Sequence, residues 1–550
     1  MIFDPATGTP GSATQTIYAG VADGRSGQPN IYRSTNGGST WAAILGQPTC
    51  TQSGNIVTCT GGVTWDVTAL GDDGLPATPK ASLLAKQGQI DSQGTLYISY
   101  SSWAGPYRGN FGDVWKFVPG TSTWTQISPA NAANGYCLAG GAPYWGYGGL
   151  GLDMQNPGTL VVAAVNSWWP DGQLFRSTDG GGTWKCLWEY QAPVTGWPPT
   201  VIKHFSLNVA SAPWLAHGNL QKPAPEASVK LGWMMEGLKI DPFNANRMMY
   251  GTGETLYGTT NLSAWDTGGT VSISSMATGM EQTSVLSLVS PPSGTAHLFS
   301  AVGDVGGWRH DNLDAAPSMA AGYIVPDSGT MTSIDYAELS PSFLVRVGSN
   351  AAFTYDSGGN WFQGNADIGN YGTVAAAANA SRVLWAPDGA PVSWSSDNGS
   401  SWNASANIPQ NSAIASDRVS TTKFYGLGGS KFWVSTDGGA TFTASAAAGL
   451  PESGEVRAVF GREGDVWVAG GAQISGGSST CTVCGLWYTA NSGSSFTKLA
   501  NVEDANAIGF GMAKPGGAGY PAIFLAGKVE GVRAIFRSDD VGATWINITD

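Results

Sequence analysis

Charged residues are scarce in this sequence, and basic residues scarcest of all. Asp, Glu, Lys and Arg together make up 12% of the 550 residues, about half of the quarter that is usual in globular domains. The formal net charge is −13, and no basic stripe is present. Because nucleic-acid binding needs clustered Lys and Arg, the composition excludes a nucleic-acid-binding protein and favours a neutral or cationic ligand.

Long apolar segments are also missing. No apolar run approaches the roughly 18–20 residues that cross a bilayer, so we expect a soluble protein without a membrane partner. The chain begins Met1-Ile2-Phe3-Asp4-Pro5, without the basic and apolar regions of a signal peptide. Export therefore cannot be inferred from this end of the sequence.

Cysteine is rare, with six residues in the whole chain. Cys50 and Cys59 flank a polar stretch that is typical of a stapled hairpin, which favours an oxidising compartment. Cys481 and Cys484 have the CxxC spacing, but zinc would need a second pair at motif spacing. The other two cysteines do not supply it, so we expect disulfides or inert thiols, with no metal and no cofactor.

Glycine and tryptophan are abundant instead, with 78 and 23 residues. One pattern recurs: Ser or Thr, any residue, Asp or Asn, any residue, Gly, any residue, a small polar residue, then Trp or Phe. This pattern is called the Asp-box below. Its seven clear copies are Ser34–Trp41, Ser177–Trp184, Thr354–Trp361, Ser395–Trp402, Ser435–Phe442, Thr489–Phe496 and Ser538–Trp545.

Each copy follows a short alternating strand, such as Ile31–Arg33 or Leu174–Arg176, and is predicted to be a hairpin turn. The Asp side chain can accept bonds from turn amides, and Gly supplies a positive φ. A carboxylate that is repeated in every unit cannot be a unique active site. We therefore expect the Asp-box carboxylates to be structural and the closing rings to lie in the core, including Trp41, Trp184, Trp402 and Trp545.

The spacing of the copies predicts the architecture. In the second half they recur about every 40–54 residues, the length of one four-stranded propeller blade. Less regular blades are predicted in the gaps, at Val114–Trp124, Leu256–Trp265 and Leu298–His310. The sequence thus predicts an all-β protein of tandem β-propellers: an incomplete first propeller of about four blades in residues 1–275, and about six blades in residues 276–550, the last missing or incomplete.

Longer strings carry a more specific signal. They are Tyr18–Asp23, Gly146–Leu150, Gln155–Thr159, Asn166–Asp171, Gly232–Met234, Ile240–Phe243, Tyr250–Gly253 and Gly303–His310. Over nearly the whole chain the sequence resembles glycoside hydrolase family 74. The resemblance implies two seven-bladed propellers that clasp a xyloglucan chain in the cleft between them. We accordingly expect about three N-terminal blades and the end of the last blade to be absent from this chain.

The resemblance also implies a general acid, because the family's Asp-Val/Ile-Gly-Gly motif at the start of the second propeller matches Asp304. The residues themselves agree with that role. Asp304 lies outside any Asp-box, beside Gly306 and Gly307, which permit close approach of a ligand. Trp308 and His310 follow it.

The family inverts the anomeric carbon, which requires a second carboxylate that activates water. In the family this base lies in a similar motif of the first blade, and no counterpart is present here. Asp367-Ile368-Gly369-Asn370 is only superficially similar, since it follows an Asp-box of the second propeller. We therefore expect this chain by itself to show little or no hydrolysis.

A long neutral glucan is held by flat aromatic faces with polar groups around them. Trp168 and Trp169 stand in tandem after an apolar strand, where they serve as a sugar platform or as packing between blades. Further candidates for substrate contacts are Tyr144, Trp145, Tyr147, Trp308 and His310. For His310 a purely structural role is the alternative.

The leading interpretation is a secreted xyloglucan endo-β-1,4-glucanase that acts as a monomer on xyloglucan or a related β-glucan. The alternative is a non-catalytic Asp-box propeller that binds a polysaccharide or, like sortilin, a protein. A sialidase is disfavoured, because it needs three Arg residues that clamp a carboxylate, and Arg is scarce here. It also usually has an Arg-Ile-Pro strand near its start, and this sequence contains no such strand.

Overall fold

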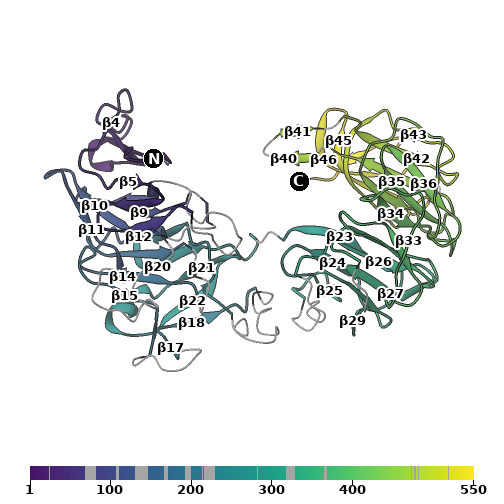
Figure 1. Cartoon of the computed structure of the whole chain (residues 1–550), viewed down its shortest axis with the longest axis horizontal. Coiled ribbons are helices and arrows are strands. Elements are labelled where there is room, and N and C mark those ends of the chain that lie inside the picture. Colours follow the sequence, from purple (N-terminus) through teal and green to yellow (C-terminus); the bar gives the residue numbers. More distant parts are fainter. Residues whose placement is uncertain are drawn as a thin grey trace. The chain divides into compact units, whose positions relative to one another are not determined.

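The chain folds into two compact units, Met1–Glu281 and Gln282–Asp550 (Figure 1). The structure is a computed structural model that describes residues 1–23, 25–68, 82–103, 105–106, 111–129, 146–165, 167, 171–191, 200–212, 215, 229–280, 283–317, 329–364, 368–471, 473–475, 478–480, 482–517 and 519–549. The described helical segments, Pro5–Thr7 and Leu262–Thr267, are short 3-10 turns, and none is long or apolar enough to cross a membrane.

The first unit is built of antiparallel meanders. Its sheets in chain order are β1 (Ile2–Phe3), β2 (Ile17–Gly20), β3 (Ile31–Ser34) and β4 (Ala42–Ala43); β8 (Leu84–Ile90), β9 (Leu96–Ser101), β10 (Val114–Val118) and β11 (Thr123–Gln126); β12 (Tyr147–Leu152), β13 (Leu160–Ala164), β14 (Leu174–Ser177) and β15 (Lys185–Cys186); and β19 (Leu238–Asp241), β20 (Asn244–Gly251), β21 (Leu256–Thr259) and β22 (Val271–Ser275), with β18 (Phe205–Asn208) parallel to β22. Two smaller sheets are inserted, β5 (Cys50–Ser53), β6 (Ile56–Cys59) and β7 (Thr64–Asp66), and β16 (Trp188–Tyr190) with β17 (Val201–Lys203).

The second unit repeats the same meander. Its sheets are β23 (Val285–Val289), β24 (Leu298–Val302) and β25 (Arg309–His310); β26 (Ser333–Ala337), β27 (Ser340–Val347), β28 (Ala351–Thr354) and β29 (Phe362–Gln363); β30 (Thr373–Ala376), β31 (Val383–Ala386), β32 (Ser393–Ser395) and β33 (Asn403–Ala404); β34 (Ala413–Ser416), β35 (Phe424–Gly428), β36 (Lys431–Ser435) and β37 (Thr443–Ala444); β38 (Glu455–Ala458), β39 (Val466–Gly470), β42 (Gly485–Thr489) and β43 (Thr497–Lys498), with the hairpin β40 (Gln473–Ser475) and β41 (Ser478–Thr480) inserted; and β44 (Val502–Gly511), β45 (Ala522–Val529), β46 (Val532–Ser538) and β47 (Ile546–Asn547).

Within each unit the sheets follow one another in chain order through their first strands, as β8 against β12 and β12 against β19, or β26 against β30 and β30 against β34. The core lies between neighbouring sheets. Val114 and Ile127 of one sheet, for example, pack in one cluster with Leu150 and Trp184 of the next. This confirms the predicted fold class, an all-β chain of four-stranded blades. Apart from the smaller inserted sheets, the described residues of the first unit form three four-stranded sheets and one five-stranded sheet, and those of the second form five four-stranded sheets and the three-stranded sheet β23–β25.

The first and last sheets of the second unit leave apolar side chains uncovered. On β23, Val285, Leu286 and Leu288 are 55%, 46% and 44% exposed, whereas every residue of the equivalent strand β26 is buried. Leu288 and Ile535 of β46 line the same cavity of about 480 Å³. Within the described residues, therefore, the first and last sheets of the second unit both border this cavity with exposed apolar side chains.

The Asp-box is a hydrogen-bonded turn, as predicted. In the copy that follows β28, Asp356 Oδ1 accepts bonds from the Asn360 amide and from Thr354 Oγ1, both at 2.8 Å. The amide of Gly358, whose φ is +76°, donates to Thr354 Oγ1 at 3.1 Å. The backbone amide of Asn360, followed by its side-chain amide, holds the pKa of Asp356 at about 2.

The closing rings of the Asp-boxes differ in burial. Trp184 is 3% exposed, and its Nε1 donates at 2.9 Å to the carbonyl of Ile127 in the preceding sheet. Trp402 and Trp545 are partly buried against neighbouring clusters. The core prediction is wrong for Trp41, which is 39% exposed. Its sheet is the first of the unit, so Nε1 bonds to the Gly38 carbonyl of its own turn instead.

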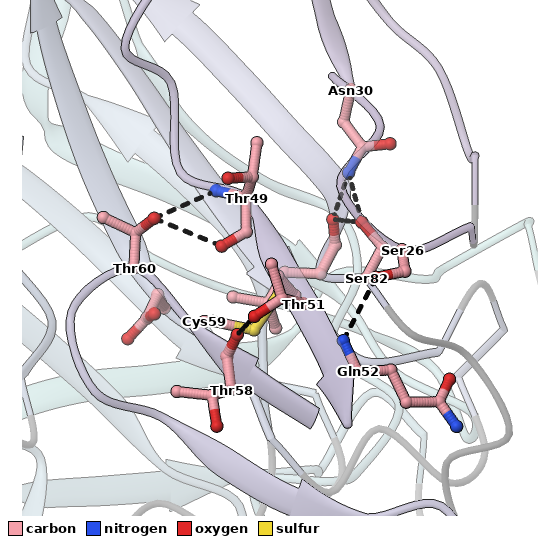
Figure 2. The surroundings of a disulfide bond; sticks show 12 residues. Ser26, Asn30, Thr49, Thr51, Gln52, Thr58, Cys59, Thr60 and Ser82 are labelled. Carbon is pink, nitrogen blue, oxygen red and sulfur yellow. Dashed lines mark hydrogen bonds between the residues drawn. A yellow bond between two sulfur atoms is a disulfide. The ribbon is translucent and has the colours of Figure 1, made fainter. Parts of the chain in front are cut away.

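The expected Cys50–Cys59 disulfide is confirmed and joins the paired strands β5 and β6 (Figure 2). Beside it Thr60 Oγ1 donates to the Thr49 carbonyl at 3.1 Å, which holds the ends of the hairpin together. Cys186 and Cys484 are disulfide-bonded as well, so none of the described cysteines is free.

Candidate active site

Asp304 lies in the tight hairpin that connects β24 to β25. Val302 and Gly306 form an isolated bridge, with the Val302 amide donating to the Gly306 carbonyl at 2.9 Å. Gly306 and Gly307 have φ values of +76° and +141°, which residues with a Cβ rarely adopt. The Gly-Gly pair is therefore required by the turn, and it keeps the backbone beside Asp304 free of side chains.

Asp304 itself has a φ of +66°, a left-handed conformation that Asp and Asn adopt more readily than other residues with a side chain. Its amide donates to Thr330 Oγ1 at 2.9 Å, and the flanking Gly303 amide donates to the Ser284 carbonyl at 2.8 Å. The hairpin is thus fixed from two segments outside it.

The side chain of Asp304 is exposed. Among the residues that the structure describes, none donates a hydrogen bond to its carboxylate or forms an ion pair with it. Two outside anchors therefore fix the hairpin, while the carboxylate itself is open to solvent.

Trp308 and His310 follow on the same hairpin but face the protein. Trp308 is 6% exposed, so the prediction of a sugar platform is wrong for this ring, which has no open face on which a sugar could stack. Its amide donates to Ser300 Oγ at 3.2 Å. His310 Nε2 lies 2.9 Å from the same oxygen, and burial lowers the pKa of His310 against the opposing effect of Asp311. Ser300 thereby ties both residues to β24.

The remaining aromatic candidates give one further correction. Tyr147 is fully buried as the first residue of β12, with its ring edge-on to Phe175 at 6.0 Å. The expectation that Tyr147 binds sugar from a glycine-rich loop is therefore wrong. Tyr144, Trp145, Trp168 and Trp169 lie outside the described residues, as does Asp367.

One buried carboxylate escaped the sequence analysis. Asp171 is 5% exposed, and its Oδ1 accepts bonds from the amides of Gly172 and Leu231, both at 2.7 Å. Burial raises its pKa to about 6 against the effect of these two bonds. A Cβ on Gly172 would meet the Gly232 carbonyl oxygen at 2.2 Å, so the two loops touch through their backbones. Asp171 joins them, and because Leu231 is 60 residues away, no local pattern could reveal it.

Fold and site together define a tandem Asp-box β-propeller protein in which Asp304 is an exposed carboxylate in a left-handed turn outside the repeats. No protein-family model matches the chain. It is 44% identical over 563 residues to a xyloglucanase of Paenibacillus sp., covering 100% of this chain and 49% of that protein. It is 42% identical over 565 residues to the xyloglucanase Xgh74A of Acetivibrio thermocellus, covering 100% of this chain and 59% of that protein. The chain thus spans between about half and three fifths of the length of these curated relatives.

Solved structures of GH74 enzymes are also similar to this chain. The GH74 enzyme of Niastella koreensis superimposes with a TM-score of 0.75 at 31% identity, over 100% of this chain and 68% of that one. The GH74 xyloglucanase of Xanthomonas campestris gives 0.75 at 28% identity over the same shares. The chain belongs to glycoside hydrolase family 74.

Proposed function

We propose that this chain is the part of a xyloglucanase that carries the general acid, and that Asp304 is that acid. The observation that carries the proposal is the contrast between Asp304 and the Asp-box carboxylates, since the Asp304 carboxylate accepts no hydrogen bond from the described residues while that of Asp356 is occupied by its own turn. The names of the relatives support xyloglucan as the substrate. Secretion and a monomeric state belong to the same proposal.

In the proposed reaction Asp304 donates a proton to the glycosidic oxygen between two backbone glucosyl units. The bond from C1 to that oxygen then breaks, and a water molecule attacks C1 from the opposite face, which inverts the anomeric carbon. The water must lose its proton to a second carboxylate about 6.5–9.5 Å from the acid.

No residue of this sequence matches the family's base, so we propose that the chain by itself hydrolyses xyloglucan slowly or not at all. A non-catalytic binding role for this chain is the second candidate, and this missing base favours it.

Azide distinguishes the two, because it is an anion that attacks C1 without a base. If Asp304 is a working acid, azide yields a glycosyl azide of inverted configuration and raises cleavage by about tenfold or more, with the 10²–10⁴ that a general base contributes as the upper bound. Asp304→Asn should abolish this gain. Asp311→Asn, which changes an exposed carboxylate on the same hairpin strand, should leave it intact. Absence of cleavage with azide would contradict the proposed acid, and fast hydrolysis without azide would mean that a base lies within the chain.

A further inference from the structure

Asp304 lies at the centre of a very tight turn. The Val305 amide donates to the Gly303 carbonyl at 2.8 Å, which closes a three-residue γ-turn around Asp304. With a φ of +66° at its centre, this is the classic form of the γ-turn, which is rare because it is strained. The next turn is closed in the same way, by the Gly307 amide on the Val305 carbonyl at 2.9 Å, but its central residue is Gly306. Glycine adopts a positive φ freely, so the turn around Asp304 is the one that depends on support from outside.

Two backbone hydrogen bonds hold the strand that enters the turn. The Gly303 amide donates to the Ser284 carbonyl at 2.8 Å, and the Met331 amide donates to the Val302 carbonyl at 3.0 Å. Neither bond uses a side chain, and neither ends on Asp304. They fix the approach to the turn, whereas the residue at its centre is held by another group.

That group is a side chain. The Asp304 amide donates to Thr330 Oγ1 at 2.9 Å, across 26 residues of sequence. Thr330 is itself well anchored, because the next residue, Met331, is fully buried, and the Thr332 hydroxyl donates to the Gly372 carbonyl at 2.8 Å. The Thr330 hydroxyl is thus a fixed acceptor for the amide of the candidate acid.

We propose that Thr330 is a positioning residue for the general acid: by holding the Asp304 amide, it sets the direction in which the Asp304 carboxylate points. A general acid works only within hydrogen-bond reach of the oxygen that it protonates, and a displacement of about 1 Å can cost about 10²-fold in rate. Thr330 acts on the reaction only through Asp304. The inference rests on the proposed function for the role of Asp304.

Thr330→Val tests this role, because it keeps the shape of the side chain and removes the acceptor. With azide present, the variant should lower kcat on xyloglucan about tenfold and leave KM unchanged. On a dinitrophenyl glycoside of a xyloglucan oligosaccharide, whose leaving group departs without a proton, the loss should stay below about twofold. Thr330→Ser retains the acceptor and should restore the rate on xyloglucan.

Thr332→Val is the matched control. It removes a threonine hydroxyl two residues away that bonds to Gly372 and not to Asp304, so neither rate should change per folded molecule. The bond between Asp304 and Thr330 is exposed, and water can replace the lost acceptor without fixing its direction. The melting temperature of Thr330→Val should therefore fall no further than that of the control.

Crystal structures of the wild type and the two Thr330 variants test the positioning without any activity. In Thr330→Val the Asp304 carboxylate should move by more than about 0.5 Å, the tolerance of a catalytic group, and in Thr330→Ser it should return. An unmoved carboxylate, or equal losses of rate on the two substrates, would overturn the proposal. If Asp304→Asn abolishes cleavage while Thr330→Val does not lower it, only the positioning fails. If the carboxylate moves but cleavage does not require Asp304, the hold of Thr330 on the carboxylate stands and the proposed acid fails.

Discussion

Asp304 and Asp356 stand on neighbouring blades of the same unit, yet their carboxylates have opposite surroundings. At Asp356 the chain closes on itself within four residues, and amide hydrogens surround the charge. At Asp304 the backbone adopts a left-handed turn and its amide is anchored at Thr330, but the carboxylate is left exposed. A carboxylate whose oxygens accept hydrogen bonds from its own turn stabilises the fold, and the same oxygens are then not free to bind a ligand. A carboxylate that serves chemistry must instead be positioned through its backbone.

The largest effect should come from removing the acid. Asp304→Ala should lower azide-dependent cleavage of xyloglucan about 10²–10⁴-fold, because the leaving oxygen then departs unprotonated. The melting temperature should not fall, since none of the described residues loses a bond to this carboxylate. Initial rates of azide-dependent cleavage and a thermal melt of the same preparation measure both quantities. A lower melting temperature would assign Asp304 to the fold rather than to the chemistry.

Asp-box rings should behave in the opposite way, with effects on stability alone. Trp184→Ala should destabilise the first unit by about 3–5 kcal/mol, the usual range for a buried Trp. Trp41→Ala should cost much less, because that ring is already 39% exposed. Urea unfolding of the two variants decides between these expectations. Equal losses would mean that burial at the turn does not determine the contribution of the ring.

Asp171 extends the comparison to a buried carboxylate. Its folded pKa of about 6 lies above the unfolded value, so the folded state binds more protons between about pH 4 and 6. Stability from this group is therefore full below about pH 4 and falls as the pH rises through 6. The decline should amount to roughly 3 kcal/mol at most. Asp171→Asn keeps an oxygen acceptor without the charge, so its stability relative to the wild type should improve between pH 4 and 7. A constant difference across that range would refute the assignment.

Asp356 should give the smallest effect and the opposite sign. Its folded pKa is lowered to about 2, so its contribution is present above the unfolded value and is lost as the pH falls from about 4 to 2. Because this carboxylate is exposed, Asp356→Ala should destabilise by about 1 kcal/mol at pH 7 and by less at pH 2. Cleavage per folded molecule should be unchanged. A loss of cleavage at full folding would place Asp356 in the active site.

These cases also explain which features the sequence could predict. The Asp-box spans eight residues and its bonds link positions two and four apart, so its turn and the structural role of its carboxylate follow from local chemistry. The blade architecture follows from the same period. The burial of Tyr147 could not be predicted, because it depends on strands from other parts of the chain. The exposure of Trp41 could not be predicted either. Its turn is regular, but its sheet is the first of the unit, so the ring does not pack on a preceding sheet as Trp184 does.

The dependence of Asp304→Ala on the leaving group tests the central claim most directly. Cleavage of xyloglucan requires protonation of the leaving sugar oxygen. In a dinitrophenyl glycoside of a xyloglucan oligosaccharide, the leaving group is dinitrophenolate, which departs without a proton. With azide present, the variant should lose about 10²–10⁴-fold in rate on xyloglucan but less than about tenfold on the dinitrophenyl glycoside. Equal losses on the two substrates would contradict the assignment of Asp304 as the general acid.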